Sequence, residues 1–172
     1  MLPVGIDLVV ATQADRPLLE RLLQLYEYDY SEYAGVDVDE GGLFPTLDAG
    51  ELLEPEPDDH VFLIRVDGQV AGFAFVTRHE SYVEPGKSYL IDEFLVLRKY
   101  RRRGVGEQVA RTLFDRFPGR WDVGTVHGNR VAQAFWRRVI ARYTGGDFRE
   151  LPDGGERWAG PIWAFESRPP PR

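Results

Sequence analysis

The stretch Tyr89–Gly106 constrains the fold more than any other part of the chain. It opens with an apolar, β-branched and aromatic run that is interrupted by Asp92 and Glu93, a composition typical of a strand. A basic turn follows and ends in Gly104–Gly106. Apolar residues then recur at three- and four-residue spacing as far as Phe117, which predicts a helix. A strand, a basic turn with glycines and a helix therefore follow one another directly.

This succession suits a phosphate group. The first N–H groups of a helix lack intrahelical partners and carry the positive end of the helix dipole. Glycine lets the backbone approach a ligand closely, and arginine adds charge-assisted hydrogen bonds to phosphate oxygens. The turn carries five basic residues within six positions: Arg98, Lys99, Arg101, Arg102 and Arg103. The alternative is a basic turn that merely caps an ordinary helix.

The turn resembles the coenzyme A pyrophosphate loop of the GCN5-related N-acetyltransferases, the GNAT superfamily. The usual form of that loop is Gln/Arg-x-x-Gly-x-Gly/Ala, and Arg101–Gly106 fits it. The preceding Phe94–Leu97, followed by Tyr100, fits the family's fourth strand and turn. The resemblance implies acetyl-CoA as cosubstrate and no metal.

The same resemblance implies a set of cofactor contacts. The strand positions that pair with the pantetheine arm match Leu95, Val96 and Leu97, and an N–H group there would polarise the thioester oxygen. The pyrophosphate would lie over the N–H groups of residues 102–107. The implied contacts in the turn are Arg101, Arg102, Arg103, Gly104, Val105, Gly106 and Glu107.

A second segment, Asn129–Trp136, resembles the family's Asn-x-x-Ala-x-x-Phe-Tyr motif. The resemblance implies that Asn129, Phe135 and Trp136 contact the cofactor. In the family the last position is often a Tyr that protonates the departing thiolate, but an indole cannot usefully donate a proton. The general acid therefore stays open between Tyr143 and the tyrosines of segment 26–33. The alternative for Trp136 is plain core packing.

Periodicity and turn residues predict the element order β-α-(α)-β-β-β-α-β-α-β-β, which matches the GNAT topology. The resemblance thus implies an α/β (α+β) fold, a central mixed and mostly antiparallel sheet flanked by helices. Asp67-Gly68 predicts a hairpin turn. We expect one domain over residues 1–168 and a frayed, proline-rich tail at 169–172. The predicted strands include 6–10, 61–66, 69–76, 121–126, 148–151 and 158–165, and a short helix is expected near 47–53.

Charge is unevenly distributed along the chain. The net charge is −7, yet segment 22–64 contains no Lys or Arg and twelve carboxylates, while the remainder has 16 acidic and 21 basic residues. The acidic segment would attract a cationic substrate, or would simply be a solvated loop. It includes Tyr26, Tyr30 and Tyr33, and in GNAT-like proteins the first helices wall the acceptor site. These three tyrosines are the predicted substrate-binding residues.

The implied reaction moves an acetyl group to a primary amine. The chain has no cysteine and hence no cysteine acyl-enzyme, so direct attack in a ternary complex is the simplest route. An alkylamine arrives protonated, so a base must accept its proton. Glu93 and Asp92 are the candidates, because carboxylates inside an apolar strand are costly unless paired or functional. Since neighbouring strand residues point to opposite faces, at most one is expected to face the cleft unless a bulge intervenes.

Other functional classes fit less well. A catalytically idle, CoA-binding sensor or scaffold is the main alternative. The acidic balance opposes nucleic-acid binding, and no apolar window is long enough for a membrane span. The three histidines lack metal-ligand spacing. No signal peptide is recognisable, and we expect a cytoplasmic enzyme. A homodimer is possible. The expected substrate is a small-molecule amine, whose identity the sequence leaves open.

Overall fold

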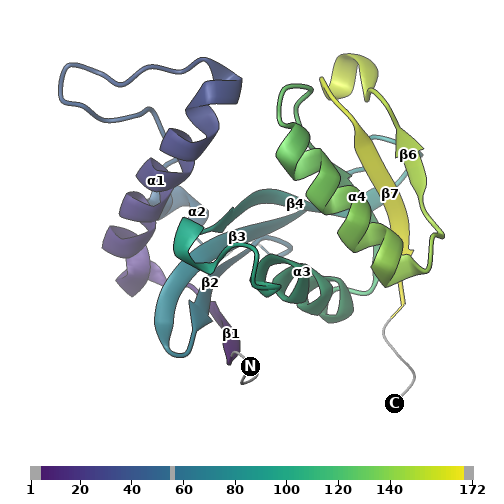
Figure 1. The fold of residues 1–172 in the computed structure, drawn as a ribbon, viewed down its shortest axis with the longest axis horizontal. Coiled ribbons are helices and arrows are strands. Elements are labelled where there is room, and N and C mark those ends of the chain that lie inside the picture. Colours follow the sequence, from purple (N-terminus) through teal and green to yellow (C-terminus); the bar gives the residue numbers. More distant parts are fainter. Residues whose placement is uncertain (1–4, 55–56, 169–172) are drawn as a thin grey trace. The chain divides into compact units, whose positions relative to one another are not determined.

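The computed structural model describes residues 5–54 and 57–168 (Figure 1). The chain divides into two compact units. Unit 1 comprises the residues up to Phe75 together with Glu93–Tyr100, and unit 2 comprises Val76–Asp92 and the residues from Arg101 onward. Strands β3 (Gln69–Glu80) and β4 (Lys87–Val96) each contribute residues to both units. The two units are described separately below.

The described residues form a seven-stranded sheet of order β1-β2-β3-β4-β5-β7-β6. The other strands are β1 (Ile6–Val10), β2 (His60–Val66), β5 (Gly119–Gly124), β6 (Arg149–Leu151) and β7 (Ile162–Ser167). The α-helices are α1 (Arg16–Ala34), α2 (Ala49–Leu52), α3 (Val105–Arg116) and α4 (Arg130–Thr144). Strand β4 pairs in parallel with β5, whereas β1–β2, β5–β7 and β6–β7 are antiparallel. The predicted fold, a mixed and mostly antiparallel sheet flanked by helices, is confirmed.

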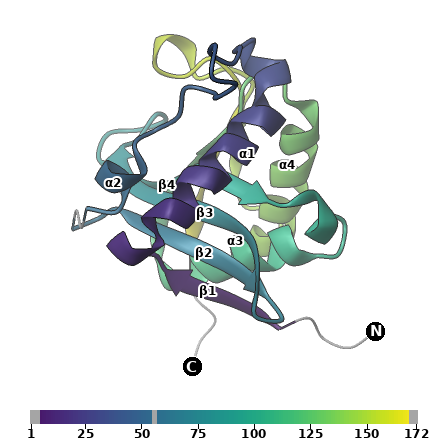
Figure 2. The same cartoon turned by 90° about the vertical axis from the view of Figure 1, so that its left-hand side faces the viewer.

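In unit 1, α1 lies across β2 and β3 (Figure 2). Its buried face consists of Leu19, Leu22 and Leu23, which join Leu63 and Phe73 in one apolar cluster. Burying each such side chain contributes about 1.5–3 kcal/mol. The helix is thereby fixed on the sheet by its first two turns.

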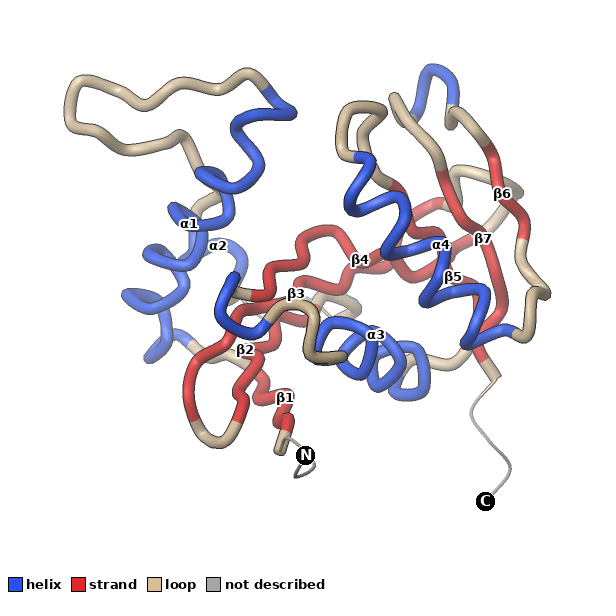
Figure 3. The backbone as a smooth tube through the Cα atoms, viewed as in Figure 1, coloured by secondary structure: helices blue, strands red, loops and turns tan. Residues whose placement is uncertain are grey.

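The entry to α1 is a capping box, as the sequence predicted. The carboxylate of Asp15 accepts a hydrogen bond from the N–H of Thr12 at 2.9 Å. The helix extends beyond its apolar face to Ala34 and ends at Gly35, whose φ of 64° suits a left-handed C-cap. The tyrosines of segment 26–33 therefore lie on helix, and a long loop follows them (Figure 3).

In unit 2, α4 lies beside β7 (Figure 1). Aromatic side chains pack between α3 and the strands β5 and β7. The ring of Phe114 on α3 lies 5.0 Å from that of Trp121 on β5 and 4.9 Å from that of Phe165 on β7. All three side chains are buried. Aromatic burial of this kind fixes α3 against β5, the strand that pairs with β4.

Several element boundaries differ from the prediction. Strand β3 continues to Glu80, β5 begins and ends two residues early, and β7 starts at Ile162 because Trp158 lies in the preceding turn. The predicted hairpin is confirmed: Asp67 and Gly68 have φ of 50° and 76°, as a type I′ turn requires. The predicted frayed tail lies outside the described residues. Within residues 5–54 and 57–168, no helix is both long and apolar enough to cross a bilayer.

Candidate active site

The two carboxylates of β4 have different surroundings. Asp92 is exposed, and Glu93 is half-buried. In addition to burial, the charge of Asp92 raises the pKa of Tyr82 in unit 2, whereas the charge of Glu93 raises the pKa of Tyr26 in unit 1. Burial and neighbouring residues therefore distinguish the two candidate bases, Asp92 and Glu93, which the sequence alone did not.

Glu93 lies against helix α1 in unit 1. The hydroxyl of Tyr26 lies beside the carboxylate of Glu93. The ring of Tyr26 stacks on Tyr30 with centroids 5.8 Å apart and meets the ring of Phe73 edge-on at 5.9 Å. Burial raises the pKa of Tyr26 far above its usual value, and the negative charge of Glu93 raises it further. Tyr26 therefore keeps its proton beside the carboxylate of Glu93.

The rest of this helix face is aromatic and acidic. Tyr30 also contacts Tyr33, at 6.2 Å between ring centroids, as expected for residues three apart on a helix. Burial and then the charge of Glu93 raise the pKa of Tyr30, and burial raises that of Glu27. The structure thus places two predicted substrate-binding tyrosines, Tyr26 and Tyr30, beside Glu93, and the third beside Tyr30.

The basic turn has an unusual backbone. Arg102 and Gly104 have φ of 61° and 80°, in the left-handed region. A Cβ atom at Gly104 would meet no other group within 4 Å, so the surface above this glycine is open. The three arginines 101–103 are exposed, and the N–H of Gln108 is bonded to the carbonyl of Gly104 at the start of α3. Exposed arginines beside an accessible helix N-terminus fit a phosphate group.

The three predicted pantetheine contacts direct their backbone groups toward different edges of β4. The N–H of Leu97 donates to the carbonyl of Ala71 at 2.8 Å. The carbonyl of Leu95 lies so close to Gly72 that a Cβ there would be 1.8 Å from its oxygen. Leu95 and Leu97 therefore direct backbone groups toward β3, and alternation directs those of Val96 toward the opposite edge of the strand.

The second matching segment is organised by helix capping. The side-chain oxygen of Asn129 accepts a hydrogen bond from the N–H of Ala132 at 3.0 Å, which confirms Asn129 as the N-cap of α4. Trp136 is only 6% exposed and packs edge-on against Phe135 at 4.9 Å. Its surroundings are those of a packed core residue, the alternative that the sequence left open.

Tyr143, one of the candidate general acids, joins two helices of unit 2. Its hydroxyl donates to the carboxylate of Asp115 on α3 at 2.7 Å, and its ring lies 5.1 Å from Phe114. Burial, followed by the bond to Asp115, raises the pKa of Tyr143 above its usual value. The hydrogen bond to Asp115 therefore gives Tyr143 a structural role between α3 and α4.

A buried polar cluster in unit 2 was missed by sequence reasoning. Asp122 on β5 is 2% exposed, and one of its oxygens accepts hydrogen bonds from the hydroxyls of Ser81 (2.8 Å) and Ser88 (2.9 Å) and from the N–H of Tyr82 (2.8 Å). The imidazole of His79 lies 3.8 Å from the same oxygen. The only signal in the sequence was a carboxylate inside the apolar strand 121–126.

The cluster contains the residue types of a Ser-His-Asp triad but not its geometry. Ser88 is 1% exposed and donates its proton directly to Asp122. Burial lowers the pKa of His79, although the charge of Asp122 acts in the opposite direction. A serine without access to a substrate cannot serve as a nucleophile, so this cluster holds elements together.

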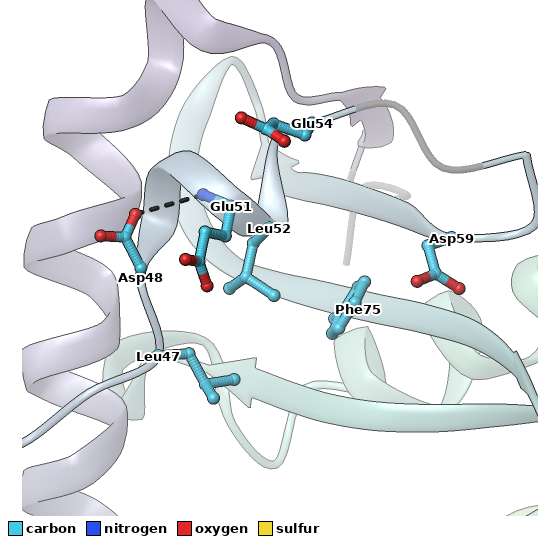
Figure 4. A pocket seen from close by; sticks show the side chains of 7 residues that line it. All are labelled: Leu47, Asp48, Glu51, Leu52, Glu54, Asp59 and Phe75. Atoms are coloured by element: carbon cyan, nitrogen blue, oxygen red, sulfur yellow. Dashed lines mark hydrogen bonds between the residues drawn. The ribbon is translucent and has the colours of Figure 1, made fainter.

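The acidic segment forms a hollow in unit 1 (Figure 4), of about 170 Å³. It is lined by Leu47, Asp48, Glu51, Leu52, Glu54, Asp59 and Phe75. Asp48 also caps α2 through the N–H of Glu51, at 3.1 Å. Four carboxylates around an apolar floor make this part of unit 1 strongly negative. Among the described residues, no three His, Asp or Glu side chains come together as metal ligands.

Comparison with known proteins decides the family. The sequence profile of the Acetyltransferase (GNAT) family matches residues 19–140, which is more than half of the chain. The chain belongs to this acetyltransferase family. The matched region includes the tyrosines of α1, both β4 carboxylates and the basic turn, so the family resemblance of the turn is confirmed. No curated protein sequence matches this GNAT acetyltransferase.

Solved structures share the fold. An acetyltransferase from Thermus thermophilus is 21% identical, with a TM-score of 0.68 over 94% of this chain and 97% of that one. An aminoglycoside acetyltransferase from an uncultured soil metagenomic sample, in complex with sisomicin, is 18% identical, with a TM-score of 0.56 over 78% and 86%. AAC(6')-Iy, in complex with a CoA-linked bisubstrate analogue of neamine, is 19% identical, with a TM-score of 0.56 over 78% and 89%. At these identities the likeness establishes the fold.

Proposed function

We propose that this GNAT acetyltransferase moves an acetyl group from acetyl-CoA to a primary amine on a small cationic acceptor. The observation that carries the proposal is the half-buried carboxylate of Glu93 on β4, beside the hydroxyl of Tyr26 on α1. In the sequence, β4 runs on into the phosphate-type turn. Structural neighbours that act on aminoglycosides, one of them with a CoA-linked analogue bound, support the same reaction class. The negative charge of segment 22–64 favours a cationic acceptor.

In the proposed reaction the amine nitrogen attacks the carbonyl carbon of the thioester, and the carbon–sulfur bond breaks. Glu93 accepts the proton that the alkylammonium loses before its nitrogen attacks, and the nitrogen loses its second proton to water as the amide forms. A thiolate with a pKa near 8.5 can depart and take its proton from water, so no tyrosine is needed at the position of Trp136. The N–H groups of the turn 101–107 would hold the pyrophosphate, and the N–H of Val96 would polarise the thioester oxygen.

The test is release of free thiol from acetyl-CoA with a panel of amines that includes 1,4-diaminobutane, spermidine and kanamycin. We expect thiol release with at least one amine, and a loss of about 100-fold or more in kcat for Glu93→Gln, the usual contribution of a general base. Tyr26→Phe, which keeps the ring but removes the hydroxyl beside Glu93, should lower kcat by a smaller factor.

A second candidate function is a CoA-binding sensor without catalysis, favoured by the buried indole of Trp136 where the family often has a tyrosine. The same assay separates the two. Tight binding of CoA with no thiol release for any amine of the panel would favour the sensor and contradict the enzyme.

A further inference from the structure

Two aromatic rings lie together on unit 2 beside the buried cluster of Asp122. The rings of Tyr82 and Trp158 are 5.7 Å apart and tilted by 40°. Both side chains are half-buried, so part of each ring is open to solvent. They come from different segments, the turn between β3 and β4 and the segment between β6 and β7.

Tyr82 is held from several directions. Its N–H donates to Asp122, and its ring lies 4.6 Å from that of His79. The guanidinium of Arg157 lies 5.6 Å from the ring centroid and donates to the carbonyls of Ser81 (2.8 Å) and Glu80 (3.2 Å). Arg157 therefore ties the segment 152–160 to the turn that carries Tyr82.

Trp158 lies flat against the end of β5. Its indole N–H donates to the carbonyl of Thr125 at 3.2 Å. A Cβ atom at Gly124 would be 2.7 Å from the indole, and one at Gly160 would be 2.0 Å from the carbonyl oxygen of Thr125. The two glycines thus allow the segment to approach the strand closely, which fixes the indole as a rigid platform.

Asp92 projects from the same face of the sheet as this platform. Because Ser88 bonds to Asp122, the face of β4 with Ser88 and Asp92 is also the face of β5 with Asp122 and Gly124, against which Trp158 packs. Burial raises the pKa of Tyr82, and the charge of Asp92 raises it further. Tyr82 is therefore a neutral phenol at neutral pH, and the carboxylate of Asp92 lies close enough to raise its pKa further.

Charge around the platform is mostly negative. Asp153 and Glu156 belong to the segment between β6 and β7, and Asp92 and Asp122 lie on β4 and β5. The guanidinium of Arg157 donates to two carbonyls. Exposed rings beside a solvent-accessible carboxylate suit an alkylammonium group, whose carbons pack on the rings while its charge faces the carboxylate.

We propose that Tyr82, Trp158 and Asp92 form the recognition site for an alkylammonium group of the acceptor. This inference rests on the proposed function and gives Asp92 a role in binding rather than in proton transfer. Asp122 and Arg157 are positioning residues, because they touch Tyr82 and its turn rather than the ligand.

The experiment is titration calorimetry of 1,4-diaminobutane into the protein saturated with CoA, together with kcat and KM in the thiol-release assay. We expect Asp92→Asn to raise both the dissociation constant and KM about tenfold, the size of one charged hydrogen bond, with little change in kcat. Glu93→Gln should do the reverse and lower kcat while binding stays within about twofold. Tyr82→Leu should weaken binding, and Tyr82→Phe should retain it.

The matched control is Asp147→Asn, an exposed carboxylate of unit 2 away from the platform, which should leave binding unchanged. Unaltered affinity in a folded Asp92→Asn variant would overturn the inference, while thiol release by the wild type would uphold the proposed function. Binding that depends on Asp92 without any thiol release would support the site and contradict acetyl transfer. Failure of the wild type to bind 1,4-diaminobutane would overturn the site.

Discussion

At the scale of single residues, backbone conformation matters most in the basic turn. Arg102 adopts a left-handed φ, which costs an L-residue about 1–2 kcal/mol, although a glycine stands only two positions on. Strain of this kind persists where the surroundings enforce it and is common at ligand sites. An arginine at this position keeps its charge at the turn, where a glycine would relieve the strain but carry no charge.

Gly104 offers a sharp test of the turn because Gly35 is a matched control. Both glycines have left-handed φ, of 80° and 64°, and a Cβ atom at either would meet nothing within 4 Å. Replacement by Ala should therefore cost each about 1 kcal/mol of stability. Only Gly104→Ala should also weaken CoA binding, by about tenfold, because it bars the backbone from close approach by a phosphate.

Calorimetry of CoA binding and thermal unfolding of both variants would check this prediction. Equal CoA affinities in the two variants would show that the turn does not hold the pyrophosphate. A large loss of stability confined to Gly104→Ala would instead point to a packing role.

At the scale of elements, Asp122 joins β5 to β4 and to the turn after β3. Asp122→Ala leaves two buried donors, from Ser81 and Ser88, and the part-buried N–H of Tyr82 without an acceptor, so we expect the free energy of unfolding to fall by about 3 kcal/mol or more. Asp122→Asn keeps one acceptor oxygen and should cost less. Asp147→Ala, on the surface, should change stability by less than about 0.5 kcal/mol.

Urea unfolding of these three variants measures the differences. A cost for Asp122→Ala no greater than that for Asp147→Ala would mean that the buried carboxylate does not tie the strands together. The comparison between Ala and Asn separates the loss of hydrogen bonds from the loss of charge.

The sequence predicted those elements whose signals are local. The capping box at Thr12–Asp15, the Asp67-Gly68 hairpin and the N-cap at Asn129 each depend on residues within a few positions, and all three are confirmed. The start of β7 was misplaced because Trp158 resembles a strand residue, whereas its position is set by contact with Gly124, 34 residues earlier. Long-range packing of that kind has no periodic signature.

The candidate site also combines residues that have a local signal in the sequence with contacts that have none. Asp92 and Glu93 stood out as carboxylates inside an apolar strand. Their separate surroundings, Tyr26 for one and the Tyr82 platform for the other, depend on segments that periodicity cannot bring together. The cluster of Asp122 was missed for the same reason, because its hydrogen bonds span 34 to 41 positions.

At the scale of the whole molecule, charge is segregated along the chain. Segment 22–64 holds twelve carboxylates and no Lys or Arg, while the rest of the chain has a net charge of +5. In unit 1, four of these carboxylates line a single hollow. A polyanionic cofactor and a cationic acceptor would each be attracted by the part of opposite charge, and salt should weaken both attractions.

The acceptor's charge should therefore set the salt dependence of its KM. At saturating acetyl-CoA, we expect the KM of spermidine to rise most between about 20 and 200 mM salt, that of 1,4-diaminobutane less and that of n-butylamine least, because the Debye length shortens from about 20 Å to below 10 Å. A triple variant, Glu51→Gln, Glu54→Gln and Asp59→Asn, spares the α2 cap at Asp48 and should flatten the dependence for spermidine. Equal salt slopes for the three amines, or an unchanged slope in the triple variant, would mean that the acidic segment serves solubility rather than attraction of the acceptor.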